Sequence, residues 1–145
     1  MSKQETKKNK KAKPIRILLV DDDEDDYIVT RDLLSDIRDF AYRLEWVETY
    51  NKAGEMFSRS DYDVYLIDYR LGDHTGLDLL RKGIKNGCKA PIIMLTGQGD
   101  HEVDLEAMNA GSSDYLVKGQ INSSSLERSI RYSIERKKAE LEKEE

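Results

Sequence analysis

The segment that most limits what this chain can fold into is a run of four apolar residues, Val64 to Ile67, that ends at Asp68. A short continuous apolar run with polar residues on both sides is typical of a strand buried on both faces, as in a parallel sheet. Asp68 would then lie at the carboxyl edge of the sheet, where open α/β sheets bind ligands. Taken alone, the segment also fits an aspartate that merely starts a turn.

Four further segments are predicted to be strands, at 15–20, 42–47, 91–95 and 115–117. Apolar residues at helical spacing follow each of the five strands. The order is therefore five β-then-α units with short connections. Such an order predicts an α/β fold, a doubly wound five-stranded parallel sheet with helices on both faces and right-handed crossovers.

Several helix starts are predicted from polar residues that can accept hydrogen bonds from free backbone amides. Asn51 is a candidate N-cap for the helix after the second strand. Thr75 and Asp78 have the spacing of a capping box, with aspartate in place of glutamate, and Ser124 and Glu127 form a second one.

Length and charge divide the chain into one folded domain with two charged ends. At 145 residues one domain is expected, and it is predicted to cover 14–136. Residues 1–13 contain six lysines and one glutamate and are predicted to be a disordered basic arm, and 137–145 a charged extension of the last helix. The acidic remainder argues against a nucleic-acid-binding surface on this domain.

Cysteine usage and hydropathy bear on the compartment. The single cysteine, Cys88, excludes an intramolecular disulfide and fits a reducing cytoplasm. No run of 18 apolar residues and no signal-peptide pattern occur, so the sequence predicts neither a membrane span nor a secretory leader. We therefore expect a cytoplasmic location without membrane contact.

The carboxyl ends of the predicted strands would bring five polar residues to one edge of the sheet: Asp21, Asp22, Asp68, Thr96 and Lys118. Crowded carboxylates repel one another, and a bound hard cation removes that repulsion. Oxygen ligands with room for water suit Mg²⁺. Phosphoryl transfer to a protein uses these same groups: a carboxylate as nucleophile, with Mg²⁺, a hydroxyl and a lysine beside it.

These residues stand in four segments whose order and spacing resemble the receiver domain of two-component response regulators, the CheY-like family. The segments are 20–22, 63–71 with Gly76 beyond it, 91–97 and 110–118. The resemblance covers about Ile15 to Ile134. It implies a flavodoxin-like (βα)5 fold with strand order 2-1-3-4-5, and a phosphorylation-dependent signalling switch.

The resemblance implies a phosphoacceptor and a metal site. Asp68 would accept a phosphoryl group from a histidine kinase or a phosphotransfer protein. Asp22 would bind Mg²⁺ directly, together with Asp68 and the backbone carbonyl of Arg70, and Asp21 would assist through water.

The resemblance also implies a switch. Thr96 would hydrogen-bond the phosphoryl group, Lys118 would pair with it, and Tyr115 would change rotamer on activation. The surface around the fourth and fifth helices would then change and control a partner or an output domain. In this role the chain would be no enzyme beyond catalysing its own phosphorylation and dephosphorylation.

The sequence departs from the family pattern at two glycines. Gly119 stands where the family usually has a proline, often after a cis bond, and a cis bond before a non-proline residue costs about 2.5–4 kcal/mol, so we expect trans. Gly72 replaces another frequent proline, so we expect a looser loop up to Gly76. Arg70 and Gln98 would face the site and are candidates for tuning the lifetime of the phosphoryl group.

Three alternative interpretations stay open at this level. Residues 23–26 are expected to form only a solvated acidic turn that stabilises the following helix. An aspartyl-phosphate phosphatase of the haloacid dehalogenase type would need a second aspartate where Arg70 stands. A pseudo-receiver that binds partners without phosphorylation is the other alternative, for which Gly119 leaves some room.

The output is not encoded in a recognisable second domain. Residues 131–142 predict a strongly charged helix with a poor heptad pattern, and hence a solvated extension rather than a coiled coil. We expect either a stand-alone receiver that acts on a downstream protein or the N-terminal piece of a chain with a C-terminal output domain. A monomer and a phosphorylation-linked dimer are both compatible with the sequence.

Overall fold

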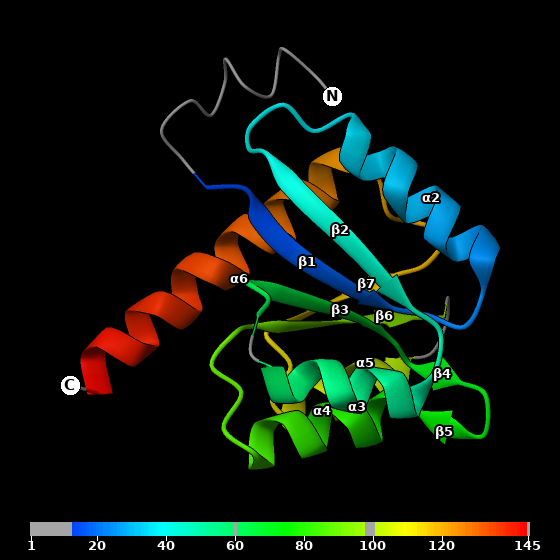
Figure 1. The fold of residues 1–145 in the computed structure, drawn as a ribbon, viewed down its shortest axis with the longest axis vertical. Coiled ribbons are helices and arrows are strands. Elements are labelled where there is room, and N and C mark those ends of the chain that lie inside the picture. The colour runs from blue at the N-terminus through cyan, green and yellow to red at the C-terminus, as the bar shows by residue number, and fades with distance from the viewer. Residues whose placement is uncertain (1–12, 60, 98–100, 145) are drawn as a thin grey trace.

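The computed structural model describes residues 13–59, 61–97 and 101–144. Its main sheet has five parallel strands in the order β2-β1-β3-β6-β7. The strands are β1 (Ile15–Val20), β2 (Tyr42–Val47), β3 (Val64–Asp68), β6 (Ile92–Thr96) and β7 (Asp114–Val117). This order is the predicted 2-1-3-4-5, so the predicted flavodoxin-like fold is confirmed (Figure 1).

Helices cover both faces of the sheet (Figure 1). On one face α2 (Glu24–Ser35) and α6 (Ser123–Glu144) pack through Leu34, Leu126 and Ile130 onto β1, β3 and β6. On the other face lie α3 (Tyr50–Arg59), α4 (Gly76–Lys85) and α5 (His101–Asn109). All five residues of β3 and all five of β6 are buried. The apolar runs of the sequence are thus central strands, as their lack of alternation predicts.

The helix starts follow the capping rules, but not always at the predicted residue. Thr75 caps α4 as predicted, because its hydroxyl accepts a hydrogen bond from the amide of Asp78. The prediction that Asn51 caps α3 is wrong, since the Thr49 hydroxyl accepts a hydrogen bond from the Lys52 amide and caps this helix. The second capping box is also wrong: Asn122 caps α6, two residues before the predicted serine.

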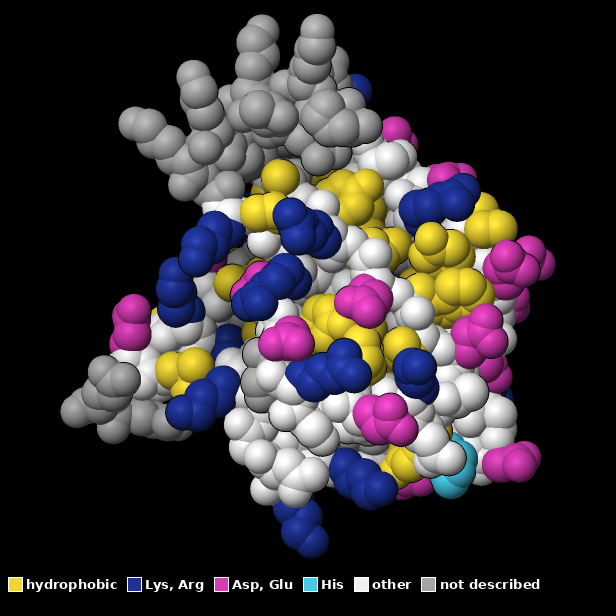
Figure 2. Space-filling view, in the orientation of Figure 1, with side chains coloured by type: hydrophobic (Ala, Val, Ile, Leu, Met, Phe, Trp, Pro, Cys, Tyr) yellow, Lys and Arg dark blue, Asp and Glu magenta, His cyan; other side chains and the backbone are white. Residues whose placement is uncertain are grey.

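The longest helix, α6, has 22 residues, and its C-terminal turns extend beyond the sheet (Figure 1). Lys and Arg side chains gather over this part of α6, whereas acidic side chains line the opposite side over α2 (Figure 2). None of the helices in the described ranges is long and apolar enough to cross a membrane.

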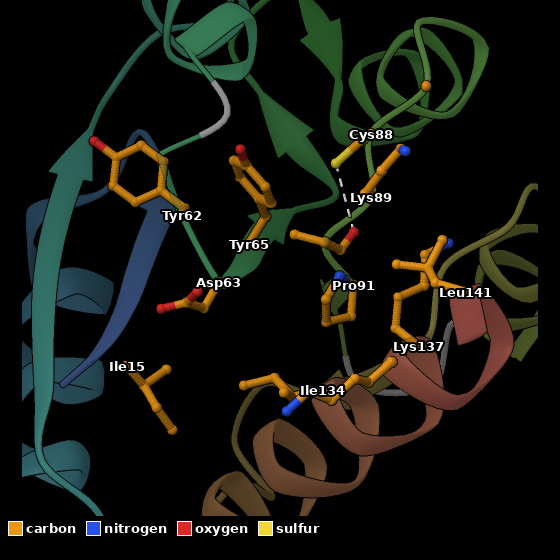
Figure 3. Close-up of a pocket in the computed structure, with 13 residues that line it drawn as sticks. Ile15, Tyr62, Asp63, Tyr65, Cys88, Lys89, Pro91, Ile134, Lys137 and Leu141 are labelled. Atoms are coloured by element: carbon orange, nitrogen blue, oxygen red, sulfur yellow. Dashed lines mark hydrogen bonds between the residues drawn. The ribbon is translucent and has the colours of Figure 1, made fainter. Parts of the chain in front are cut away.

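A cavity of about 520 Å³ opens at the amino ends of the central strands (Figure 3). Ile15, Tyr65 and Pro91 form its sheet side, and Ile134 and Leu141 of α6 close the other side. It lies at the edge of the sheet opposite the predicted site, so the polar residues at the carboxyl ends are a separate feature.

Candidate functional site

The carboxyl ends of the strands bring three of the predicted residues into direct contact. Asp21 follows β1, Asp68 ends β3, and Lys118 follows β7. The Nζ atom of Lys118 lies 3.2 Å from Asp21 Oδ2 and 3.0 Å from Asp68 Oδ1. One ammonium is therefore shared by two carboxylates that are almost entirely buried.

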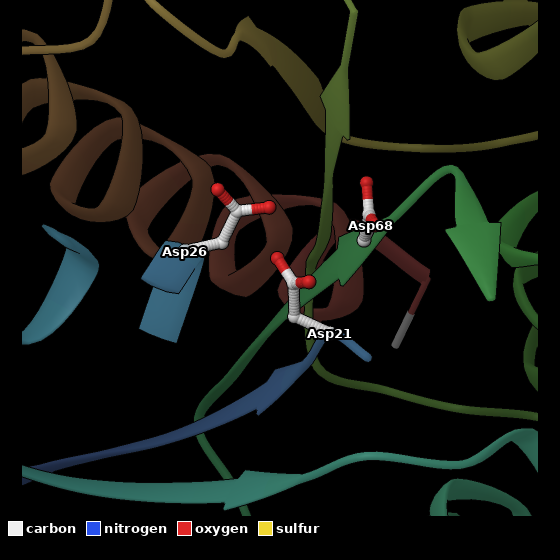
Figure 4. A group of neighbouring side chains, drawn as sticks. All are labelled: Asp21, Asp26 and Asp68. Carbon is white, nitrogen blue, oxygen red and sulfur yellow. The ribbon is translucent and has the colours of Figure 1, made fainter. Parts of the chain in front are cut away.

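A third carboxylate, which the sequence analysis assigned to a solvated turn, joins them. Asp26 lies in the first turn of α2, which starts at Glu24, three residues before the expected position. Its Oδ2 accepts a hydrogen bond of 2.5 Å from Lys118 Nζ. Carboxylate oxygens of Asp21, Asp26 and Asp68 all lie within 4.8 Å of one another (Figure 4). The prediction for Asp26 is therefore wrong, because the early helix start turns this side chain back toward the sheet.

Burial shifts the pKa values of the charged groups in the site. Burial raises the pKa of Asp21 to about 6, with repulsion from Asp68 adding to it and Lys118 opposing it. Burial likewise raises the pKa of Asp68, although Lys118 and the backbone amide of Arg70 work against the shift. Burial alone would lower the pKa of Lys118, but the hydrogen bond to Asp26 and the charge of Asp68 raise it overall. Lys118 therefore stays protonated. Its single positive charge only partly compensates the negative charge of the carboxylates.

A hard divalent cation would fit this arrangement. The buried Oδ2 atom of Asp21 lies 3.2 Å from Lys118 Nζ but has no hydrogen-bond partner among the described residues. Three carboxylates against one ammonium leave negative charge in a largely buried site. Carboxylate and carbonyl oxygens are the ligands that Mg²⁺ prefers.

Asp22 lies apart from this cluster. Its side chain is exposed, and its Oδ2 accepts a 2.9 Å hydrogen bond from the Gly72 amide. That amide belongs to a hairpin of β4 (Arg70–Leu71) and β5 (His74–Thr75), with Gly72 at φ +61°. The glycine allows a tight turn at a positive φ that proline could not adopt, whereas the expected looseness of the loop stays a prediction.

The remaining predicted residues differ in how far they approach the site. Thr96 is fully buried at the end of β6, but its hydroxyl donates to Asp104 of α5 at 2.6 Å. The Tyr115 side chain is half-buried against the core. Arg70 is exposed and forms no ion pair with any described residue. Gln98 lies outside the described residues.

Glycines shape the backbone on both sides of the site. The peptide bond before Gly119 is trans, as expected, and Gly119 has a φ of +87° in a turn closed by Gln120 onto Val117. A Cβ atom on Gly76 would stand 2.1 Å from the carbonyl oxygen of Asp68. This close approach explains why a glycine opens α4 directly behind the end of β3.

The only tryptophan of the chain, Trp46, lies next to the carboxyl edge of the sheet that carries the site. The indole of Trp46 donates a 2.7 Å hydrogen bond to the backbone carbonyl of Asp21. Its ring stacks on Tyr27 of α2, with centroids 4.4 Å apart. Tyr27 lies next to Asp26 in the chain, so Trp46 contacts the two segments that carry Asp21 and Asp26.

Comparison with known proteins agrees with this architecture. The family model described as the response regulator receiver domain matches residues 17–131. The response regulator RppA of Synechocystis is 31% identical over 106 residues, which are 72% of this chain and 44% of that protein. The transcriptional regulatory protein PhoP of Escherichia coli is 28% identical over 72% of this chain and 45% of its own length. This chain thus spans less than half the length of these relatives.

Among solved structures, a CheY-like response regulator receiver domain protein from Methanospirillum hungatei is similar throughout. It has a TM-score of 0.76 and 27% identity, and the match covers 88% of this chain and 99% of that one. The likeness therefore extends over nearly the whole of that receiver domain.

Proposed function

The chain belongs to the response regulator receiver domain family, and we propose that Asp68 is its phosphoacceptor, with the phosphohistidine of a histidine kinase or a phosphotransfer protein as donor. The observation that carries this proposal is the position of Asp68. Asp68 is a buried residue, 6% exposed, that ends the central strand β3, and its carboxylate lies 3.0 Å from the ammonium of Lys118.

In the transfer, a carboxylate oxygen of Asp68 forms a bond to phosphorus as the bond between phosphorus and the donor imidazole breaks. The imidazole leaves as the neutral base or its protonated form, and an acyl phosphate remains on Asp68. Lys118 would pair with the incoming phosphoryl oxygens and hold the orientation of Asp68 beforehand. Attack of water on the acyl phosphate would restore the carboxylate and release inorganic phosphate.

Mg²⁺ would be held by Asp21, Asp22, Asp68 and the backbone carbonyl of Arg70. When bound, it would neutralise charge on the phosphoryl oxygens. Asp22 accepts from the Gly72 amide through Oδ2, which leaves its Oδ1 as the oxygen that would take part. Asp26 would keep its hydrogen bond with Lys118 and so limit the movement of the ammonium.

Phosphorylation would act on the protein surface through Thr96 and Tyr115, which stand on the last two strands beside α5 and α6. The altered surface would regulate a downstream protein or a C-terminal output domain of the kind that the longer transcriptional regulatory relatives suggest. This would take place in the cytoplasm, with the receiver as a monomer or a phosphorylation-linked dimer.

Incubation with acetyl phosphate and Mg²⁺, followed by intact-protein mass spectrometry, tests the proposal. The wild type should gain the mass of one phosphoryl group, and Asp68→Asn should gain none. Asp63→Asn is the matched control, because it changes the aspartate just before the same strand and should still be phosphorylated. Phosphorylation of Asp68→Asn at the wild-type level would refute the assignment.

We also propose that Arg70 and Gln98 tune the lifetime of the acyl phosphate, since each follows a site residue by two positions. Dephosphorylation rates of the wild type, Arg70→Ala and Gln98→Ala should differ. Three equal rates would remove this part of the proposal.

A further inference from the structure

The hydroxyl of Thr96 is hydrogen-bonded to an acid of the neighbouring helix. It donates a 2.6 Å hydrogen bond to Oδ1 of Asp104 in α5. Thr96 is fully buried and Asp104 is 7% exposed, so the bond lies in the interior. Hydrogen bonds to a charged acceptor are shorter and stronger than neutral ones. Within the described part of the chain, Asp104 forms no ion pair.

A threonine hydroxyl has one proton and can donate one strong hydrogen bond at a time. If it donates to a phosphoryl group on Asp68, it must release Asp104. The Asp104 carboxylate is then buried without its donor, which is unfavourable unless α5 moves or water enters. A cost of this kind would couple the state of Asp68 to the position of α5.

We propose that Asp104 is a positioning residue that competes with the phosphoryl group for the Thr96 hydroxyl and so opposes the active state. This inference rests on the proposed phosphoacceptor role of Asp68. It adds a chain-specific control: the hydrogen bond to Asp104 keeps the unphosphorylated form dominant, and its rupture transmits phosphorylation to α5. The helix carries Leu105 and Met108, whose side chains are 54% and 41% exposed, so its movement would change an apolar surface.

The binding of beryllofluoride, a mimic of the phosphoryl group, measures this competition. With Mg²⁺ present, the affinity can be followed by the fluorescence of Trp46, which contacts the backbone of Asp21. Asp104→Ala frees the hydroxyl and should bind beryllofluoride about tenfold more tightly than the wild type. Asp104→Asn keeps a weaker, neutral acceptor of the same size and should give about a threefold gain.

Two comparisons separate the hydrogen bond from loss of negative charge. Glu106 is an exposed acid two residues further along α5, so Glu106→Ala removes the same charge without touching Thr96. Its affinity should stay near that of the wild type. In a Thr96→Val background, which has no hydroxyl to compete for, Asp104→Ala should give no gain.

The outcomes are distinct. Equal affinities of the wild type and Asp104→Ala, equal gains in Asp104→Ala and Asp104→Asn, or a gain that persists without the Thr96 hydroxyl would overturn the role of Asp104 alone. Failure of the wild type and every variant to bind beryllofluoride would overturn both this role and the phosphoacceptor assignment. Far-UV circular dichroism of each variant checks that it is folded.

Discussion

Strand β3 has an aspartate at each end, and the two differ in almost every physical respect. Asp63, just before the strand, keeps 37% of its side chain exposed and has a cation of its own. Its two carboxylate oxygens accept from Nε and Nη2 of Arg16 at 3.3 and 3.2 Å. Asp68, at the other end, keeps only 9% of its side chain exposed and shares the ammonium of Lys118 with Asp21 and Asp26.

The two aspartates differ in their surroundings and not in residue type, and the proposal that Asp68 is the reactive one rests on that difference. At the Asp63 end, one carboxylate pairs with the guanidinium of Arg16 in partial contact with solvent. The two charges balance, so this end has no excess charge for a cation to neutralise. At the Asp68 end, three carboxylates meet one ammonium, and burial raises the pKa of both Asp21 and Asp68. A cation or a phosphoryl group held by a cation would relieve this imbalance.

The largest expected effect concerns the shared lysine. Lys118→Met should lower the rate of phosphorylation by acetyl phosphate about 100-fold, because a positioned charge at the reacting phosphoryl group is removed. Lys89→Met is the matched control, since Lys89 is an exposed lysine on the rim of the cavity at the other edge. Rates from a time course of intact mass check the difference. Equal rates for both variants would mean that the ammonium plays no part.

The second expectation is a gain of stability from removing an acid at the crowded end. Asp21→Asn should raise the free energy of unfolding by about 2 kcal/mol at pH 7 without added metal, because the folded state no longer has to ionise a buried group. Asn can keep the hydrogen bond that Asp21 Oδ1 accepts from the amide of Asp23. Urea unfolding measures the effect.

The pH dependence gives the sign of this effect. The folded-state pKa of Asp21 is about 6, above its ordinary value of 3.8. The folded protein therefore binds more protons than the unfolded chain between these values, and stability falls as pH rises from about 4 to 6. The fall should be smaller in Asp21→Asn. An identical pH profile for wild type and variant would contradict the raised pKa.

Mg²⁺ should stabilise the wild type through the same acids. At ten times its dissociation constant, a ligand of the folded state alone adds about 1.4 kcal/mol. The apparent affinity should weaken below pH 6, because protonated Asp21 is a poor ligand. Thermal unfolding with and without EDTA checks this. Asp63→Asn should be stabilised by Mg²⁺ as much as the wild type. If this variant lost the stabilisation, the cation would bind at the Asp63 end of β3, which contradicts the proposal.

The sequence predicted the sheet well because its signals are strong and local. Val64–Ile67 and Ile92–Leu95 are unbroken apolar runs of the length typical of a strand buried on both faces, and polar residues directly follow them. Once the strands were parallel, Asp21, Asp68 and Lys118 had to meet, because all strands end at the same edge. Their convergence therefore followed from topology.

Contacts made by helices could not be read in the same way. Asp26 was expected in a solvated turn before its helix, and nothing in the sequence singled out Asp104, which the structure places in the first turn of α5. Their burial depends on where each helix starts and how it rotates against the sheet, and a shift of one residue turns a side chain by about 100°. The predicted N-caps show the same limit, since Thr49 and Asn122 took the roles given to Asn51 and Ser124.

The smallest expected effect is at the Asp63 end of β3. Asp63→Asn removes an ion pair whose arginine side chain is 51% exposed, so the free energy of unfolding should fall by only about 0.5 kcal/mol. An asparagine oxygen can still accept the hydrogen bond from the Arg16 backbone amide, which limits the loss further. Because salt screens exposed charges, the difference from wild type should shrink in 1 M NaCl. A loss of several kcal/mol that salt leaves unchanged would mean that Asp63 is as tightly coupled as Asp68, and the contrast between the two ends would fail.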